Sequence, residues 1–342
     1  MSAVPPQQPI LTVPETMRLA TFNIETLDSP RKGTASLEER GEILRPQLAR
    51  LDADVLCLQE VNSQRIKGTK TRTLSALQTL IKGTQYENYQ ITASRGGEGH
   101  SLADVHNLVI LSKFPICSVL ELRHTIVPPM QYLSLTAAPL EISPQPIHFE
   151  RPILIAELAL PDDRTMTVVN LHLRAPLAST IAGQKESAFV WKKTAAWAEG
   201  FFLSSMKRNA QALELRLAID NMLDTDARRL LAVCGDFNAE DHETPIKLLQ
   251  AGEDDTGNGH LSARSLVIAD RALPQDRRFS VVHHGRAQML DHILISRHLA
   301  AFLKGIEVHN EILPDEAASA GMSHNAPGSY HAPVVAEFSI YA

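Results

Sequence analysis

The chain has 342 residues, of which 44% are hydrophobic and 21% are charged. These fractions lie close to globular averages and exclude a chain that is mainly disordered. The formal net charge of −6 argues against nucleic-acid binding through a largely basic surface, although a local basic groove stays open. No stretch approaches the roughly 20 consecutive apolar residues of a membrane-spanning helix, so no transmembrane segment is expected.

The first residues of the chain indicate whether a signal peptide is present, and the cysteines indicate the redox state of the compartment. Residues 1–16 contain four prolines and no apolar run, which predicts an extended tail rather than a signal peptide. Cys57, Cys117 and Cys234 each lie among apolar residues and form no CxxC pair. They are therefore expected to be core residues of a protein in a reducing compartment, by default the cytoplasm.

Short apolar runs rich in β-branched residues predict eight strands. In chain order they are Met17–Ile24, Val55–Gln59, Asn107–Leu111, Ile153–Leu158, Thr167–Leu173, Leu231–Gly235, Leu290–Ile295 and Pro333–Ile340. Several of these runs are almost continuously apolar, which is typical of strands buried on both faces.

Longer segments with helical periodicity lie between some of these strands. Ser36–Leu51 and Leu74–Ile81 each predict a helix, and Ala182–Leu223 predicts two, separated near Gly200 or at the Ser204–Ser205 pair. Strands mixed with helices without strict alternation favour a layered α/β sandwich over a barrel or a Rossmann sheet.

Residues 124–152 contain six prolines, which exclude a central strand or a long helix and predict a loop or insertion. The sequence shows no obvious apolar hairpin with aromatic tips of the kind that docks on membranes. The insertion is nevertheless where such a hairpin would lie, and this keeps a lipid substrate open.

Polar and ionisable side chains recur where the apolar runs begin or end. They are Asn23 and Glu25, Gln59 and Glu60, Asn170 and His172, Asp236 and Asn238, Asp291 and His292, and His331. A charge beside a buried strand is costly unless it is paired or metal-bound. One such residue alone could cap a turn or a helix, but six sites together favour a shared functional site. Oxygen-rich ligands suit Mg²⁺ or Mn²⁺ better than zinc.

Seven short motifs carry a family resemblance through their order along the chain. They are Thr-Phe-Asn (21–23), Leu-Gln-Glu-Val (58–61), Ile-Leu-Ser-Lys-Phe-Pro-Ile (110–116), Val-Asn-Leu-His-Leu (169–173), Gly-Asp-Phe-Asn-Ala (235–239), Leu-Asp-His-Ile-Leu-Ile-Ser (290–296) and Ser-Tyr-His-Ala-Pro-Val (329–334). From about residue 17 to its end, the chain resembles the endonuclease/exonuclease/phosphatase superfamily, which includes deoxyribonuclease I and the neutral sphingomyelinases.

The resemblance implies a fold and a division of the chain. It implies a four-layer α/β sandwich in which two mainly antiparallel β-sheets pack face to face with helices outside. Residues 17–342 would form a single domain after the tail of residues 1–16.

The resemblance also implies a hydrolase with a divalent cation. Glu60 would be the principal ligand of Mg²⁺, for which Mn²⁺ could substitute, and Asn23 would lie beside it. The cation would neutralise phosphate oxygens and stabilise the leaving oxyanion.

Five further residues carry catalytic roles by the same resemblance. Asp236 would orient or deprotonate the attacking water, and Asn238 would donate its amide to the phosphate. His331 would act as a base or transition-state donor, with Asp291 fixing its tautomer and raising its pKa. His172 would be a second donor to the phosphate.

Two further positions, Asn107 and Tyr330, are candidates for contact with the substrate. Asn107 is a weaker candidate for phosphate binding. Where the family usually has Ser-Asp-His, this chain has Ser329-Tyr330-His331, so one carboxylate is lost and a second metal site is in doubt. Tyr330 would either contact the substrate, through its hydroxyl or by stacking on a base, or be a core or rim aromatic residue without a chemical role.

The substrate is inferred from the loop after Glu60. Arg65, Lys67, Lys70 and Arg72 are four positive charges with no acid among them, and they could contact the phosphates of a polynucleotide. We therefore expect a DNA nuclease, with RNA as a further substrate. A solvated basic turn, a sphingomyelinase-like lipid phosphodiesterase and a non-catalytic binding module remain alternatives.

A second basic group is expected on the predicted helices of Ala182–Leu223. It contains Lys185, Lys192, Lys193, Lys207 and Arg208, mixed with Glu186 and Glu199, and a plain solvated face is the favoured interpretation. Trp191 and Trp197 are expected in the core rather than as platforms for stacking bases.

Overall fold

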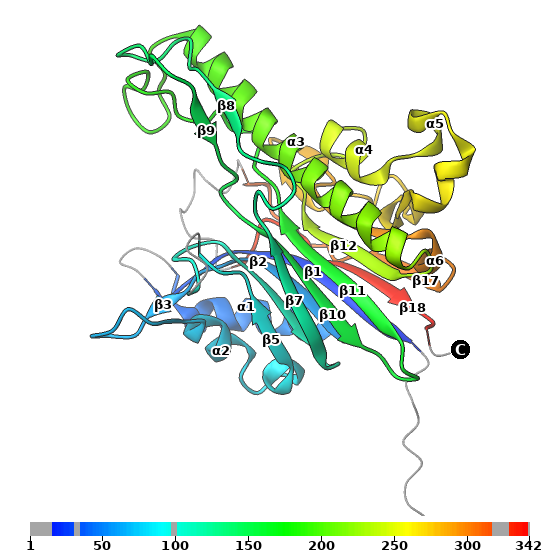
Figure 1. Cartoon of the computed structure of the whole chain (residues 1–342). Helices are drawn as coiled ribbons and strands as arrows, with labels where there is room; N and C mark the ends of the chain where they lie inside the picture. The colour runs from blue at the N-terminus through cyan, green and yellow to red at the C-terminus, as the bar shows by residue number, and fades with distance from the viewer. Residues whose placement is uncertain (1–15, 31–34, 97–100, 317–327, 341–342) are drawn as a thin grey trace, which may run out of the picture.

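A computed structural model describes residues 16–30, 35–96, 101–316 and 328–340. The expected tail, apart from Thr16, lies outside these residues. Two six-stranded sheets form the centre of the molecule, and helices lie on their outer faces (Figure 1). This mixed α/β sandwich confirms the fold that the resemblance implied.

The first sheet has the strand order β17-β18-β1-β2-β6-β5. Its strands are β1 (Met17–Leu27), β2 (Val55–Val61), β5 (Gln90–Ala93), β6 (Asn107–Ser112), β17 (Leu303–Val308) and β18 (Val334–Phe338). Every neighbouring pair is antiparallel except β1 and β2, which run parallel.

The second sheet has the order β13-β16-β12-β11-β10-β7. Its strands are β7 (Ile116–Leu122), β10 (Ile153–Ala159), β11 (Thr165–His172), β12 (Leu230–Asp236), β13 (Leu266–Ile268) and β16 (Asp291–Ser296). Here β11 and β12 form the one parallel pair. The eight predicted strands are all present in these two sheets.

Three apolar clusters hold the layers together. The largest lies between the sheets and includes Leu19 of β1 and Val168 of β11. A second joins the first sheet to α1 (Leu37–Leu51) and α2 (Ser75–Ile81), and a third joins the second sheet to α3 (Thr194–Thr225) and α4 (Thr244–Gln250). Because successive side chains of a strand point to opposite faces of the sheet, one strand contributes to two of these clusters.

The remaining elements are short and lie outside the main sheets. Three two-stranded hairpins are β3 (Gln64–Arg65) with β4 (Arg72–Thr73), β8 (Met130–Tyr132) with β9 (Gln145–Ile147), and β14 (Val281–His283) with β15 (Arg286–Gln288). The short helices are α5 (Glu253–Thr256), α6 (Arg297–Ala300) and three 3₁₀ segments, Gln85–Asn88, Gly259–Arg264 and Ala269–Ala272.

The prediction of two helices within Ala182–Leu223 is wrong. Residues 182–193 form a loop, and α3 then continues without a break through Gly200. A Cβ atom at Gly200 would lie 2.3 Å from the carbonyl oxygen of Ser179. Glycine is therefore needed here because another backbone approaches the helix closely, not because the helix ends.

Two expectations about burial are also wrong. Cys57 and Cys234 are buried as predicted, but Cys117 is exposed on β7, at the edge of the second sheet. Trp197 is 45% exposed rather than part of the core. Among the described residues, no helix has both the length and the apolar character that crossing a membrane requires.

Candidate active site

Three neighbouring strands of the second sheet bring three candidate residues side by side. In the parallel pairing of β11 with β12, His172 lies opposite Asp236. In the antiparallel pairing of β12 with β16, Asp236 lies opposite Asp291. The last residue of β11, the last of β12 and the first of β16 therefore meet at one edge of the sheet.

The first sheet presents its candidates at the same place. Asn23 of β1 pairs with Gln59 of β2, so Asn23 and Glu60 lie together at the ends of two parallel strands. His331 precedes β18, which pairs with β1 on its other side. Glu60 has a φ of 62°, a left-handed conformation that is uncommon outside glycine and often found at functional sites.

Direct contacts join the two sheets at this edge. The Asn23 amide donates to Asp236 Oδ2 at 3.0 Å. His172 Nε2 lies 3.2 Å from the same carboxylate oxygen and 3.9 Å from Glu60 Oε1. The structure thus brings together residues that are separated by as much as 213 positions in the chain.

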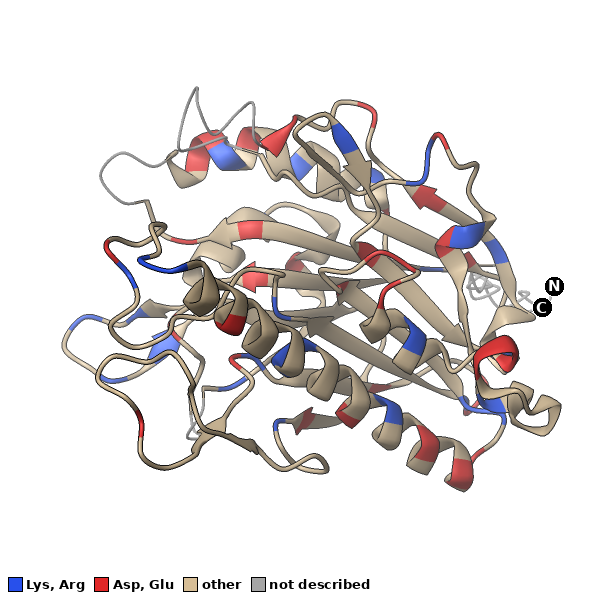
Figure 2. Cartoon of the chain, turned by 90° about the horizontal axis from the view of Figure 1, so that it is seen from above, with Lys and Arg blue, Asp and Glu red and all other residues tan. Residues whose placement is uncertain are grey.

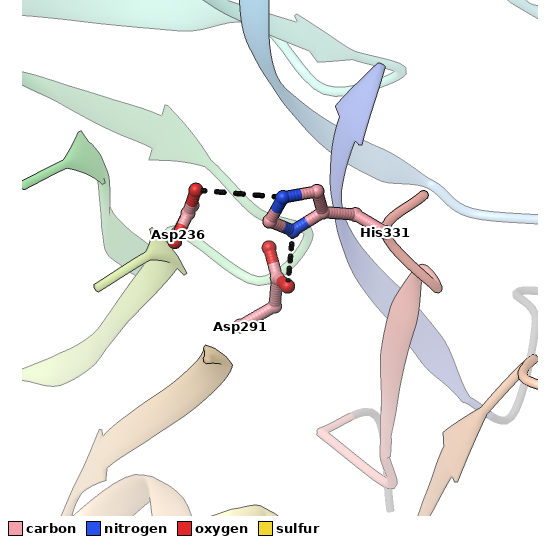
Figure 3. Close-up of side chains that lie close together, drawn as sticks. All are labelled: Asp236, Asp291 and His331. Carbon is pink, nitrogen blue, oxygen red and sulfur yellow. Dashed lines mark hydrogen bonds and ion pairs between the residues drawn. The ribbon is translucent and has the colours of Figure 1, made fainter. Parts of the chain in front are cut away.

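Asp236, Asp291 and His331 form a compact group within this site (Figure 3). His331 Nδ1 lies 2.7 Å from Asp291 Oδ2, and His331 Nε2 lies 3.9 Å from Asp236 Oδ2. Each residue offers one atom within 4.8 Å of the others, so the group could also hold a metal ion. Asp291 Oδ1 is buried without a hydrogen-bond partner, which leaves it available to a ligand.

The two carboxylates strongly affect the imidazole between them. Burial lowers the pKa of His331, but the charges of Asp291 and Asp236 outweigh it and raise that pKa to about 10. Burial would raise the pKa of Asp236, yet His172 and His331 hold it well below its usual range. Asp291 differs, because burial and the charge of Asp236 together raise its pKa. His331 is therefore held as an imidazolium beside an ionised Asp236 at neutral pH.

Glu60 is kept ionised by its neighbours. Burial alone would raise its pKa, but the nearby His172, His106 and Arg151 lower it. Its Oε2 accepts hydrogen bonds from the backbone N–H and the hydroxyl of Thr26, each at 3.1 Å. A fixed, ionised carboxylate of this kind is well suited to bind a hard cation.

The turn after β12 fixes the orientation of Asp236. The backbone N–H of Asn238 donates to Asp236 Oδ1 at 2.8 Å, and its side-chain amide donates to Asp236 Oδ2 and to the carbonyl of Leu173. Gly235 has a φ of 143°, and a Cβ atom there would lie 2.0 Å from the carbonyl oxygen of Leu171. The Gly-Asp-Phe-Asn motif therefore permits the close approach of two backbones and also supplies polar side chains.

The other predicted binding residues are placed less favourably. Asn107 is fully buried, and its amide contacts the backbone of Ala103 and Val61. Arg72 contacts Ser63 and forms an ion pair with Asp104. These contacts show that Asn107 and Arg72 organise loops, which does not support a role in binding substrate.

Arg65, Lys67 and Tyr330 keep some exposure. Arg65 and Lys67 are exposed on the β3–β4 hairpin, just after Glu60. Tyr330 is half-buried, and its backbone N–H donates to Glu25 Oε2 at 2.8 Å.

Three charged residues of the site were not assigned a role from the sequence. Glu25 is close enough to Glu60 and His331 for their charges to act on its carboxyl, whose pKa is raised mainly by burial. Arg151 is partly buried and interacts electrostatically with Glu60 and Asp236. His106 Nδ1 lies 3.6 Å from Glu60 Oε2. The sequence pattern could have identified Glu25, because it is one of the polar residues at the strand ends. Arg151 lies in the proline-rich segment, where no such pattern marks it.

Comparisons with solved structures agree with this architecture. The human Nocturnin catalytic domain with bound sulfate has 21% sequence identity and a TM-score of 0.53, with 94% of this chain and 93% of that chain covered. Truncated Caenorhabditis elegans TDP2 has 16% identity and a TM-score of 0.55, covering 94% and 97%. An endonuclease/exonuclease/phosphatase from Bacteroides vulgatus has 15% identity and a TM-score of 0.55, covering 94% and 98%.

The sequence comparisons identify the family. No curated protein matches the chain. A family model described as Endonuclease/Exonuclease/phosphatase family matches residues 20–331. This match spans all the strand-end residues described above, and the chain belongs to the endonuclease/exonuclease/phosphatase family.

Proposed function

We propose that this protein is a divalent-cation-dependent phosphodiesterase that cleaves phosphate esters by attack of water, with DNA as its substrate. The observation that carries this proposal is the convergence of Glu60, His172, Asp236, Asp291 and His331 on one edge of the sandwich. Carboxylates beside imidazoles at rigid strand ends are suited to bind a cation, a phosphate and a water together.

The donor set fits Mg²⁺ or Mn²⁺. Glu60 offers a firmly ionised carboxylate, and Asn23 Oδ1 accepts only one hydrogen bond in the described structure, from the N–H of Glu25 at 3.0 Å. A carbonyl oxygen has two lone pairs, so Asn23 keeps one for a cation. When bound, the cation would neutralise the negative charge of the phosphate and of the developing oxyanion.

Glu25 is a further candidate for this cation site. It accepts from the backbone N–H of Tyr330, at the position where the resemblance led us to expect an aspartate. Burial and the charge of Glu60 both raise the pKa of Glu25, and a bound cation would relieve that repulsion. We propose that Glu25 supplies the carboxylate that Tyr330 does not.

The carboxylate of Asp236 and the imidazolium of His331 would perform complementary tasks. Asp236 is oriented by Asn23 and Asn238 and would position the attacking water as a hydrogen-bond acceptor. His331, held through Nδ1 by Asp291, would donate a hydrogen bond from Nε2 to a phosphate oxygen. Its high pKa keeps that donor protonated at neutral pH.

His172 and Arg151 would assist in holding the phosphate. His172 Nδ1 is buried and has no partner among the described residues. The charges of Glu60 and Asp236 both act on Arg151. Hydrogen-bond donors placed before the reaction stabilise the transition state without a reorganisation cost.

The exposed β3–β4 hairpin supports DNA as the substrate. Arg65, Lys67 and Lys70 are exposed beside the strand that carries Glu60. They are placed to contact phosphates that flank the scissile bond, which would make the affinity for DNA depend on salt.

We propose a cytoplasmic location, consistent with three free cysteines.

A lipid phosphodiesterase is the second candidate. It is favoured by exposed apolar side chains in the segment between β11 and α3, including Phe189, which is 92% exposed. A soluble protein rarely exposes a large apolar patch without a binding role.

A substrate panel tests the proposal. Plasmid DNA, single-stranded DNA, RNA, bis-p-nitrophenyl phosphate and phospholipid vesicles would be incubated with the protein in Mg²⁺, in Mn²⁺ and in EDTA. We expect cation-dependent cleavage of DNA and of the small diester. The rate of Asp236→Asn should be at least about 100-fold lower than that of wild type. Glu240→Gln is the control, because Glu240 lies near the site but pairs with Arg286. Cleavage of lipid alone would select the second candidate, and no cleavage of any ester would indicate a binding module.

A further inference from the structure

The long helix α3 lies over the outer face of the second sheet, across strands that end at the active site (Figure 1). Towards its end the face that packs on the sheet is apolar and includes Leu215 and Ile219. Nearer its start the same face is polar, because Ser204, Arg208 and Gln211 precede Leu215 at intervals of four, three and four residues. All three polar residues are buried, so each needs a hydrogen-bond partner.

Each of the three polar side chains donates to a backbone carbonyl beside a different strand. The serine hydroxyl donates to Ala175, after β11, at 3.0 Å. The arginine donates to Asn238, after β12, and the glutamine donates to Arg151, before β10, at 3.0 Å. Strands β12, β11 and β10 are neighbours, and β10 runs antiparallel to the other two, so these three positions lie at one edge of the sheet. One face of α3 thus fixes the backbone along the edge that carries the catalytic candidates.

Arg208 is the charged member of this row. Figure 2 shows charged residues along α3, and the sequence predicted a solvated face here, but Arg208 is only 8% exposed. Its Nη1 donates to the Asn238 carbonyl, and its Nη2 donates to Glu243 Oε2 at 3.2 Å. Glu243 Oε1 in turn accepts from the backbone N–H of Glu240 at 3.0 Å. A planar guanidinium can hold a carbonyl and a carboxylate at once, which a lysine ammonium does less well.

The turn after β12 depends on such support. Asn238 has a φ of 48°, a left-handed conformation that is uncommon outside glycine. Its N–H and side-chain amide donate to Asp236 on one side, and its carbonyl accepts from Arg208 on the other. The next carbonyl, that of Ala239, lies 2.9 Å from Nε2 of the buried His292. Without Arg208, Asn238 could relax out of this conformation and withdraw its two donors from Asp236.

We propose that Arg208 is a positioning residue of the active site, which holds Asn238 in the conformation that directs Asp236 at the attacking water. The inference rests on the proposed hydrolysis, in which Asp236 positions that water. Arg208 acts through the turn, because its two terminal nitrogens contact residues 238 and 243. Its loss should therefore affect the turnover number more than the binding of substrate.

The same helix offers a matched control. Arg216 lies eight residues further along α3 and is also buried, at 6% exposed. It donates to the carbonyls of Leu249 and Arg264 and to the carboxylate of Asp220. These partners are not among the candidate site residues. A purely structural contribution should therefore be similar for the two arginines, whereas a positioning role should belong to Arg208 alone.

Kinetics of bis-p-nitrophenyl phosphate hydrolysis in Mg²⁺ provide the first test. Arg208→Met should lower kcat by about tenfold or more and change KM by less than about threefold. Arg208→Lys should recover part of the rate, because it keeps a charged donor. Arg216→Met should lower stability in urea to a similar extent but leave kcat within about threefold of wild type. Equal losses of kcat in the two methionine variants would overturn the proposal.

Hydrogen exchange provides a second test, which requires no turnover. In mass spectrometry, Arg208→Met should speed amide exchange in the peptide that contains residues 236–239 by about tenfold or more. Arg216→Met should instead speed exchange near residues 249 and 264 and leave the turn protected. Unchanged exchange of the turn in Arg208→Met would contradict the proposal, whether or not the protein hydrolyses esters.

These outcomes separate this inference from the proposed hydrolysis. If wild type cleaves no ester but Arg208→Met loosens the turn, the hydrolysis fails and the support of the turn by Arg208 stands. If wild type cleaves the diester and both methionine variants behave alike, the hydrolysis stands and the positioning role fails. Should Arg208→Met not fold, Glu243→Gln should still lower kcat and speed exchange of the turn, by smaller factors. No change in either quantity would then contradict the proposal.

Discussion

His172 and Asp236 lie directly opposite each other on parallel strands β11 and β12, with His172 Nε2 3.2 Å from Asp236 Oδ2. Asp236 in turn lies opposite Asp291 on β16. Strand register alone thus places three of the catalytic candidates in one row. A shift by one residue in either pairing would turn a side chain to the other face of the sheet.

The row depends on Gly235, which has a φ of 143°. We expect Gly235→Ala to destabilise the fold by about 3 kcal/mol or more, because the new Cβ would clash with the carbonyl of Leu171 in a strained conformation. Urea unfolding measures the change. Gly305→Ala is the control, since a Cβ at Gly305 meets nothing within 4 Å. Equal stability of the two variants would contradict this role of Gly235.

The His331–Asp291 contact predicts a pH dependence of stability. The pKa of His331 is raised to about 10 in the folded protein, against about 6.5 for an unperturbed histidine. Its contribution to stability is therefore complete below about pH 6.5 and is lost as pH rises through about 10. In EDTA, the free energy of unfolding of wild type relative to His331→Asn should fall steadily across this range. A difference that grows with pH would contradict the assignment.

Cation binding can be measured apart from catalysis. We expect Glu60→Gln and Glu25→Gln each to weaken Mn²⁺ affinity by about tenfold or more, because each removes a proposed ligand charge. Electron paramagnetic resonance of free Mn²⁺ gives the affinity directly. Glu87→Gln, at a solvent-exposed position outside the site, should leave it unchanged. If Glu25→Gln alone left the Mn²⁺ affinity unaltered, Glu25 would not be a ligand, and Glu60 would remain the proposed one.

The basic hairpin predicts a specific salt dependence. Lys67→Ala should weaken DNA binding and reduce the slope of log affinity against log salt by about one, if Lys67 contacts one phosphate. Arg72→Ala should instead loosen the hairpin, because Arg72 contacts Ser63 and Asp104. Lys82→Ala, exposed after α2, serves as a control. An unchanged slope in Lys67→Ala would exclude the hairpin from the DNA interface.

The sequence predicted the strands, and the polar residues at their ends, for a physical reason. Buried strands need near-continuous apolar runs, so a polar residue such as Asp236 or His172 is conspicuous where the run ends. The order of the motifs then identified the family, and with it the two face-to-face sheets that apolar patterns alone leave undetermined. The family match over residues 20–331 confirms that identification.

Other features depend on tertiary contacts that local patterns do not encode. Gly200 signalled a helix break, but its actual role is to let the Ser179 carbonyl approach α3. Arg72 looked like a free cation until Asp104 was found beside it. Trp197 was expected in the core but is 45% exposed, because the apolar side chains of α3 that pack on the second sheet lie further along the helix, from Ala212 to Leu223. In each case a distant segment decides the role.

The most direct test is the rate of bis-p-nitrophenyl phosphate hydrolysis by wild type and Glu60→Gln across a Mg²⁺ titration, with EDTA as the zero point. We expect the wild-type rate to rise from zero in EDTA and to saturate with Mg²⁺, and the variant to remain at least about 100-fold slower at every concentration that saturates wild type. Hydrolysis in EDTA equal to that in Mg²⁺, or a variant as fast as wild type, would contradict a cation held by Glu60 at this site.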